Sequence, residues 1–188
     1  MPVQAGTAVD RVKYGAYLLN LESVASAQLI IAATGSELAL AVQGAKLLGE
    51  KGIVASVVSM PCFELFEAQG KEYVFLDPLS SVTIFNSIAT EPPGFCRYQL
   101  SVFKPGLPVL SVEASSIKGW EKYAHLSIGL DDCYGASGPY KAVLAKFGFT
   151  VENVVAQAET LLAFYEKAGP APSKINVPTS SFVVAAGH

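Results

Sequence analysis

The chain has 188 residues, of which 51% are hydrophobic and 15% are charged, and its formal net charge is −3. This length suits one well-cored domain, and the lack of clustered Lys and Arg argues against binding to nucleic acid or to an anionic membrane. No apolar run reaches the roughly 18 residues that a membrane-spanning helix needs. Three scattered cysteines favour a reducing compartment, so we expect a cytoplasmic or organellar protein with a lightly charged, partner-binding surface.

The first third of the chain predicts a β-α-β unit. Residues 13–28 are expected to form a short strand or extended piece followed by a turn. Leu29–Thr34 is a continuous apolar run, typical of a parallel strand that is covered on both faces, and Ile53–Ser59 is expected to be a second buried strand. Between them, Gly35 is expected to end the first strand, and Ser36 is expected to cap a helix rich in alanine and leucine.

The middle of the chain predicts two further strands. A short helix is expected to open at Pro61, and residues 74–97 then form an aperiodic stretch that is expected to be a surface excursion. Strands are predicted over Pro108–Ala114 and Leu126–Asp132, with a short helix over 118–125 between them.

The last third predicts two helices and a tail. Ser137 is expected to cap the first helix, which Gly148 ends. Thr150 is expected to cap the second, whose apolar residues recur at helical spacing from Val151 to Tyr165. Residues 169–188 are rich in Pro and Ser and are interpreted as a tail, docked through its apolar end over 182–184.

Alternating strands and helices predict an α/β fold, a three-layer α/β/α domain over residues 1–168 with an insertion expected at 74–97. The turn at Gly35 and Ser36 is a candidate anion site, because a strand-turn-helix junction points N–H groups at one spot. It lacks the glycines of a G-x-G-x-x-G fingerprint, and Glu37 would repel an anion. A structural turn is therefore favoured over a phosphate site.

Other candidate residues form no complete catalytic set. Ser137 and Gly138 form a second turn before a helix, but Pro139 stands where a G-x-S-x-G elbow needs glycine. His125, the one internal histidine, has no nucleophile nearby and is expected to be structural. Glu113 ends a predicted parallel strand, where α/β sites lie, and is either a site residue or one that fixes a loop.

Several stretches, taken together, closely resemble the C-terminal domain of transketolase. They are IAATGSELALAVQGAKLL, PVLSVEAS, GWEKYAHLSIGLDD and YGASGPYKAVLAKFGFTVENVV, which stand in the family's order. The resemblance covers residues 13–165 apart from 74–97. It implies a mostly parallel sheet of about five strands with one antiparallel strand.

The resemblance also implies a function. Transketolases transfer a two-carbon ketol unit between sugar phosphates, using thiamine diphosphate and Mg²⁺ or Ca²⁺ held by their other domains. The C-terminal domain would bind no cofactor or metal, contribute no catalytic residue, and support contacts with the other domains and the second subunit of a homodimer. A regulatory binding site has been proposed for the family, and Gly35, Ser36, Ser137 and Gly138 are the candidates here for binding an anion or a regulatory ligand.

Two departures from the family leave questions open. Asp132, Cys133 and Tyr134 replace an Arg-Phe pair, which removes a positive charge from that loop. Residues 74–97 are either a lineage-specific insertion, which we favour, or a translated intron. The corresponding domain of deoxyxylulose-phosphate synthase or of a 2-oxo acid dehydrogenase E1, and a stand-alone small-ligand module, are the alternative functions.

Overall fold

The computed structural model describes residues 11–19, 26–72, 97–131 and 135–172. Its strands are β1 (Tyr17–Leu18), β2 (Leu29–Ala33), β3 (Ala55–Ser59), β4 (Val109–Val112) and β5 (Leu126–Ile128). Its helices are η2 (Gly35–Glu37), α2 (Leu38–Glu50), α3 (Phe63–Glu72), α5 (Arg97–Val102), η3 (Trp120–Lys122), α6 (Tyr140–Lys146) and α7 (Val151–Ala168), where η marks a 3₁₀ turn. None of the described helices is long and apolar enough to cross a membrane.

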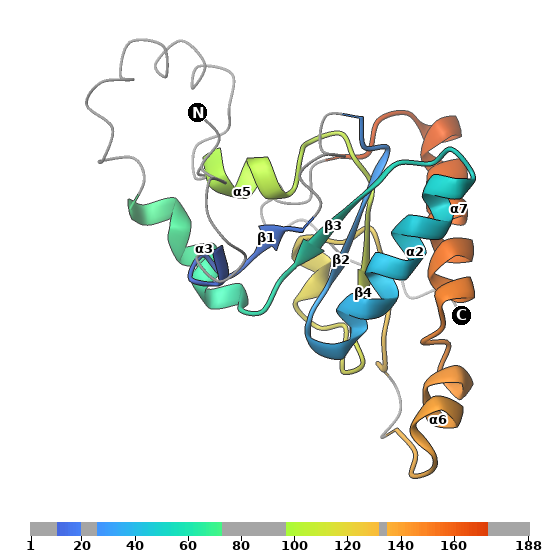
Figure 1. Ribbon diagram of the computed structural model, residues 1–188. Coiled ribbons are helices and arrows are strands. Elements are labelled where there is room, and N and C mark those ends of the chain that lie inside the picture. Colours follow the sequence, from blue (N-terminus) through green and yellow to red (C-terminus); the bar gives the residue numbers. More distant parts are fainter. Residues whose placement is uncertain (1–10, 20–25, 73–96, 132–134, 173–188) are drawn as a thin grey trace, which may run out of the picture.

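The strands form one sheet in the order β1-β3-β2-β4-β5 (Figure 1). β2 pairs in parallel with both β3 and β4, and β4 pairs in parallel with β5. β1 alone runs antiparallel, with Tyr17 opposite Ser59. The predicted α/β class and the sheet with one antiparallel strand are therefore confirmed.

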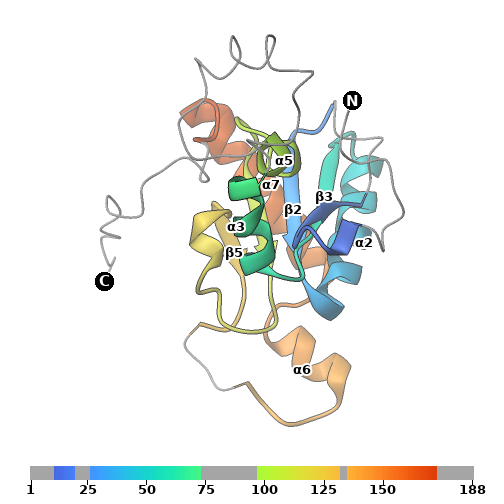
Figure 2. The same ribbon diagram turned by 90° about the vertical axis from the view of Figure 1, so that its left-hand side faces the viewer.

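The central strands β2 and β4 are buried on both faces, as their mostly apolar sequences predict. Alternate residues point to opposite faces, so Ile31 packs in a core with α2 and α7, while Ile30 packs in a second core with α3 and η3. Figure 2 shows α3 and α5 together on the face opposite to α2. These two cores make the domain three-layered.

Close packing holds α2 against α7. A Cβ atom at Gly44 would lie 2.7 Å from Cγ1 of Val154, so only glycine lets the two helices approach this closely. Lys51 at the end of α2 pairs with Glu159 of α7 at 2.5 Å. The predicted cap at Thr150 is confirmed, because its Oγ1 accepts a hydrogen bond from the backbone N–H of Asn153 at 3.2 Å.

The two predicted serine caps are wrong. Ser36 lies inside the 3₁₀ turn η2, which separates β2 from α2, and Glu37 occupies the cap position of α2 without a side-chain cap bond. The cap position of α6 belongs to Pro139, again without a side-chain bond, and Ser137 lies two residues earlier. A 3₁₀ turn precedes α2 and Pro139 precedes α6, so the cap positions of both helices differ from those that the sequence spacing predicts.

Some elements differ in extent from the prediction. The helix expected over 118–125 is a single 3₁₀ turn, and the strand expected to reach Asp132 ends at Ile128. Gly129 follows it, where a Cβ would lie 2.2 Å from Ile117. Helix α5 was not predicted. Three stretches named above lie outside the described residues: 74–96 of the expected insertion, 132–134, where the sequence differs from the family, and the tail from 173.

Candidate functional site

The carboxyl ends of β2 and β4 form the point of the sheet where α/β proteins most often bind ligands. From β2 the chain continues to β3 on one side, while β4 lies on the other, so the direction of winding changes between β2 and β4. Gly35, Ser36 and Glu37 follow β2, and Glu113 follows β4. The described candidate site is therefore built from these two loops.

The loop after β2 carries its own carboxylate. Gly35 has a φ of +56°, a conformation that glycine adopts without strain. The Ser36 hydroxyl donates to Oε1 of Glu37 at 2.5 Å, and Glu37 is buried, with 6% of the residue exposed. A Cβ at Gly35 would lie 3.6 Å from the other Glu37 oxygen. An anion at this turn would meet a buried negative charge.

Glu113 adds a second carboxyl to the same end of the sheet. The buried indole of Trp120 donates its Nε1–H to Oε2 of Glu113 at 3.4 Å. Burial raises the pKa of Glu113 above its ordinary value of 4.5, the Trp120 hydrogen bond lowers it, and the charge of Glu37 raises it again. The two loops therefore place two carboxyl groups, one buried and one partly exposed, at this end of the sheet, which disfavours phosphate.

This raised pKa predicts a pH-dependent loss of stability. The folded state holds the Glu113 proton more tightly than the unfolded state, so stability falls as the pH rises from about 4.5 through the folded pKa. Glu113→Gln removes that loss. We expect it to raise the free energy of unfolding by less than about 1 kcal/mol at pH 7, because solvent screens a partly exposed carboxyl, and to have no such effect near pH 4. Urea unfolding at both pH values checks this, and an equal gain at both would contradict it.

The second predicted turn stands apart from these carboxylates. Ser137 and Gly138 are exposed and precede α6, which lies at the foot of the molecule in Figures 1 and 2. Among the described residues, no hydrogen bond joins this turn to Gly35 or Ser36. An anion or regulatory site at these four residues stays a prediction.

His125 is structural, as the sequence predicts. Its Nδ1 accepts the backbone N–H of Val109 at 3.0 Å, which requires the proton to be on Nε2. Nε2 lies 2.8 Å from the carbonyl oxygen of Pro172, and the ring meets Tyr165 edge-on. Both ring nitrogens are thus engaged in holding the chain after α7 against the start of β4.

The described residues assemble no group of three or more His, Cys, Asp or Glu side chains that could hold a metal ion. Asp131 is exposed and accepts a hydrogen bond from the Ser116 hydroxyl at 3.3 Å.

Sequence reasoning identified Glu113 but missed the burial of Glu37 and the contact between Glu113 and Trp120. Trp120 lies only seven positions after Glu113, and no pattern in the sequence indicates that its indole turns back.

Comparison with known proteins identifies the family. The model of the transketolase-like C-terminal domain matches residues 15–150. Transketolase of Kluyveromyces lactis is 40% identical over 166 residues, which are 88% of this chain and 20% of that enzyme. Transketolase 1 of Saccharomyces cerevisiae is 36% identical over the same shares. The chain thus spans about a fifth of the length of these curated relatives.

Comparison with solved structures leads to the same family. The Pichia stipitis transketolase in complex with sedoheptulose-7-phosphate superposes with a TM-score of 0.71 at 35% identity, over 92% of this chain and 21% of that one. Transketolase from Leishmania mexicana gives a TM-score of 0.67 at 36% identity, over 90% and 21%. Fold, sequence and family model together show that the chain belongs to the transketolase family and corresponds to its C-terminal domain.

Proposed function

We propose that this chain acts as the non-catalytic C-terminal domain of a cytoplasmic, homodimeric transketolase of the pentose phosphate pathway. The observation that carries the proposal is its match to one fifth of each relative, in a region that the family model describes as the C-terminal domain. The domain would support the assembly of the catalytic domains and contribute no group to ketol transfer. The transketolase relatives and the matching family model favour this over the synthase and dehydrogenase alternatives.

The described residues do not fit thiamine diphosphate. Its diphosphate group needs cationic or metal-bound partners, whereas the switch point of this sheet presents Glu37 and Glu113. Burial and the charge of Glu37 already raise the pKa of Glu113, so the site disfavours further negative charge. We therefore assign thiamine diphosphate and its Mg²⁺ or Ca²⁺ to other domains and derive no catalytic step in this chain.

The proposal predicts that the isolated chain has no transketolase activity. With a ketose phosphate, an aldose phosphate, thiamine diphosphate and Mg²⁺, we expect product formation no faster than in buffer. A chimera in which this chain replaces the matching fifth of the Kluyveromyces lactis enzyme should transfer ketol units. A coupled spectrophotometric assay measures both.

The unmodified Kluyveromyces lactis enzyme and the same enzyme without its matching fifth are the controls. Turnover by the isolated chain would contradict a non-catalytic role. A folded chimera no more active than the shortened enzyme would contradict the assignment as a working transketolase domain.

A further inference from the structure

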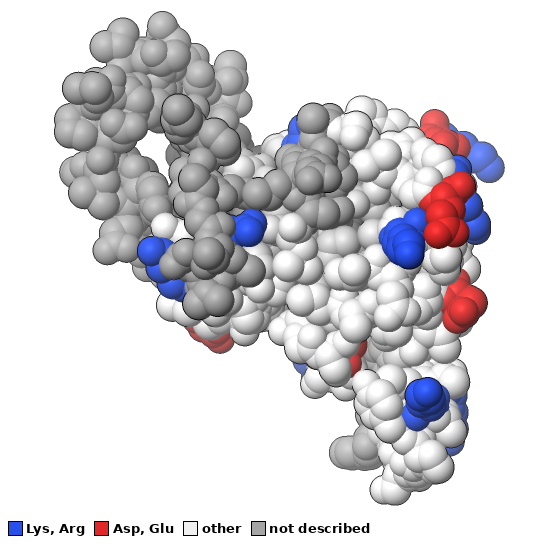
Figure 3. Space-filling view, viewed as in Figure 1, with Lys and Arg blue, Asp and Glu red and all other residues white. Residues whose placement is uncertain are grey.

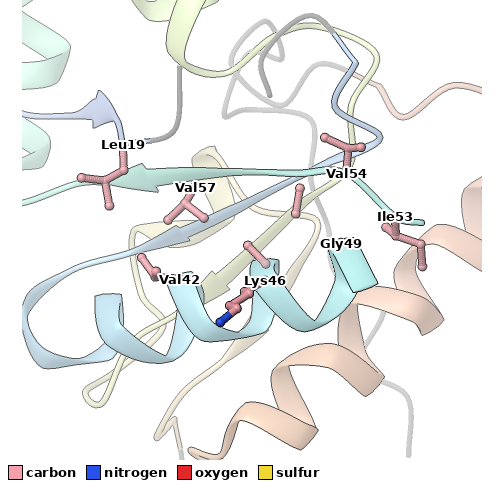
Figure 4. A pocket seen from close by; sticks show the side chains of 9 residues that line it. Leu19, Val42, Lys46, Gly49, Ile53, Val54 and Val57 are labelled. Atoms are coloured by element: carbon pink, nitrogen blue, oxygen red, sulfur yellow. The ribbon is translucent and has the colours of Figure 1, made fainter. Parts of the chain in front are cut away.

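An open apolar groove of about 540 Å³ lies between α2 and β3, and Figure 4 shows Val42, Lys46 and Val57 around it. Figure 3 shows the surrounding face largely without charged side chains, which stand mainly at its edges. Lys46 is the one charged side chain among the lining residues and is itself exposed. A lone exposed lysine beside an apolar lining defines no ligand, so we assign none to this groove.

His125 joins two parts of the chain through its ring. Nδ1 accepts the backbone N–H of Val109 at 3.0 Å, and Nε2, which therefore carries the proton, donates to the carbonyl oxygen of Pro172 at 2.8 Å. The backbone N–H of His125 also donates to the Val109 carbonyl at 2.8 Å. The neutral ring thus extends the pairing of β4 with β5 by one bond and ties Pro172 to the start of β4.

The segment that this ring holds crosses the amino ends of the strands. Gly169, with a φ of +93°, ends α7, and the chain leaves that helix at the top of the view in Figure 1. Ala171 forms an antiparallel bridge with Gly106, just before β4, and is 3% exposed. Residues 169–172 are therefore held at two adjacent points, the bridge to Gly106 and the hydrogen bond from His125.

The arrangement around His125 accepts only the neutral ring. Protonation adds a proton to Nδ1, so that two N–H groups would point at each other across 3.0 Å. The charged ring must therefore turn away from Val109. Val109 is 3% exposed, so its N–H would then lack an acceptor in a buried place. Both nitrogens belong to one rigid ring, so the ring cannot leave Val109 and keep Pro172 where it now lies.

The groups that face the ring do not offset this effect. α7 brings the Tyr165 ring edge-on, with 5.3 Å between the ring centroids, and burial raises the pKa of that phenol above 10.0. Tyr165 is therefore uncharged in the pH range where histidine titrates. Val109 of β4 and Pro172 have no titratable side chain. Because His125 is partly exposed, protons reach its ring from the solvent.

We propose that His125 is a pH-dependent latch, which holds residues 169–172 at the start of β4 when it is neutral and lets them move away when it is protonated. The stability that the latch contributes is present above the ordinary histidine pKa of about 6.5 and is lost as the pH falls below it. The bridge between Ala171 and Gly106 opens with it. This device concerns the conformation of the domain and does not depend on the proposed function.

An NMR titration of the full chain from about pH 8 to about pH 5 tests the latch. Long-range ¹H–¹⁵N spectra report the tautomer and charge of His125, and a peptide of residues 122–128 gives the unfolded reference. We expect the Nε2–H tautomer at pH 8, and a ring that stays neutral where half of the peptide is protonated. The amide signals of Val109 and Ala171 should shift with the midpoint of the ring, and that of Ile31 should not.

Two results of the titration would overturn the proposal. The first is a ring that charges at the same pH as the peptide while the amide signals of Val109 and Ala171 stay in place. The second is a change of the Ile31 signal together with that of Ala171, which would mean that the whole domain unfolds and that no separate segment is released.

Two variants separate a latch from a merely structural histidine. In His125→Asn the side-chain oxygen replaces Nδ1 as an acceptor, in His125→Gln the amide nitrogen replaces Nε2 as a donor, and neither side chain titrates. Thermal midpoints are compared at pH 7 and pH 5 in a Glu113→Gln background, because the raised pKa of Glu113 would add a pH effect of the opposite sign.

Between these two pH values, we expect the midpoint of the chain with His125 to fall by roughly 2–4 °C more than that of either variant. Lower midpoints of the variants at both pH values would reflect the lost hydrogen bonds and leave this difference intact. Equal falls in all three proteins would overturn the latch. If a variant does not fold, the titration of the unmodified chain decides.

Discussion

Replacing Gly15 with alanine is expected to lower the free energy of unfolding by about 3–5 kcal/mol, enough to unfold a marginally stable domain. Gly15 has a φ of +82°, where L-residues are strained. A Cβ there would lie 2.3 Å from the backbone nitrogen of Phe66 and 2.4 Å from the carbonyl oxygen of Cys62. Backbone atoms cannot turn aside as the end of a flexible side chain can, so the start of α3 must shift.

The measurement is urea unfolding followed by circular dichroism, with Gly49→Ala as the matched control. Gly49 lies in α2, and a Cβ there would meet nothing within 4 Å. Alanine should raise stability at this position by about 0.5–1 kcal/mol, since it restricts the unfolded chain and favours the helix. Equal effects of the two substitutions would show that the close approach of Gly15 to α3 is not required for folding.

The elements that the sequence predicts well are those whose signal is local. The run at β2 is apolar throughout because both faces of a central parallel strand are covered, and this pattern can be recognised without knowing what covers the strand. The cap at Thr150 and the helical spacing of the apolar residues after it likewise depend on α7 alone. The sequence predicts these features from residue type and from the periodicity of apolar residues.

The features that could not be predicted depend on residues far apart in the chain. Helix α5 is fixed by contacts that no local pattern contains: the Tyr98 hydroxyl donates to the carbonyl oxygen of Ala16, and Gln99 Nε2 donates to that of Phe66. Serine is a common residue at helix N-caps, but Ser36 lies in a 3₁₀ turn and its hydroxyl donates a hydrogen bond to Glu37 instead. Local propensity identified the turn, but the 3₁₀ conformation and the adjacent Glu37 determine which group the hydroxyl contacts.

The same distinction applies to the candidate site. Position at the end of a strand was enough to select Glu113, because the ends of parallel strands meet at one edge of the sheet. The burial of Glu37 and the raised pKa of Glu113 arise only when β2 and β4 lie side by side. The switch point therefore has the location of a ligand site, but its charge disfavours the phosphate that such a location most often binds.

Replacing Trp120 with alanine should lower the free energy of unfolding by about 3–5 kcal/mol, because it leaves a large cavity in the second core. Trp120 is 1% exposed, and its ring meets Phe63 edge-on, with 5.0 Å between the ring centroids. Its indole also donates the hydrogen bond to Glu113. Because it is the one tryptophan of the chain, circular dichroism rather than tryptophan fluorescence must follow unfolding of the variant.

Trp120→Phe separates packing from hydrogen bonding. Phenylalanine keeps a ring against Phe63 and removes the indole N–H, so we expect a smaller loss of about 1–2 kcal/mol. The hydrogen bond partly offsets the desolvation of Glu113, and its removal should raise the pKa of that carboxyl further. Glu113→Gln should therefore stabilise the phenylalanine variant more at pH 7 than it stabilises the unmodified chain. Equal gains in the two backgrounds would mean that Trp120 contributes through packing alone.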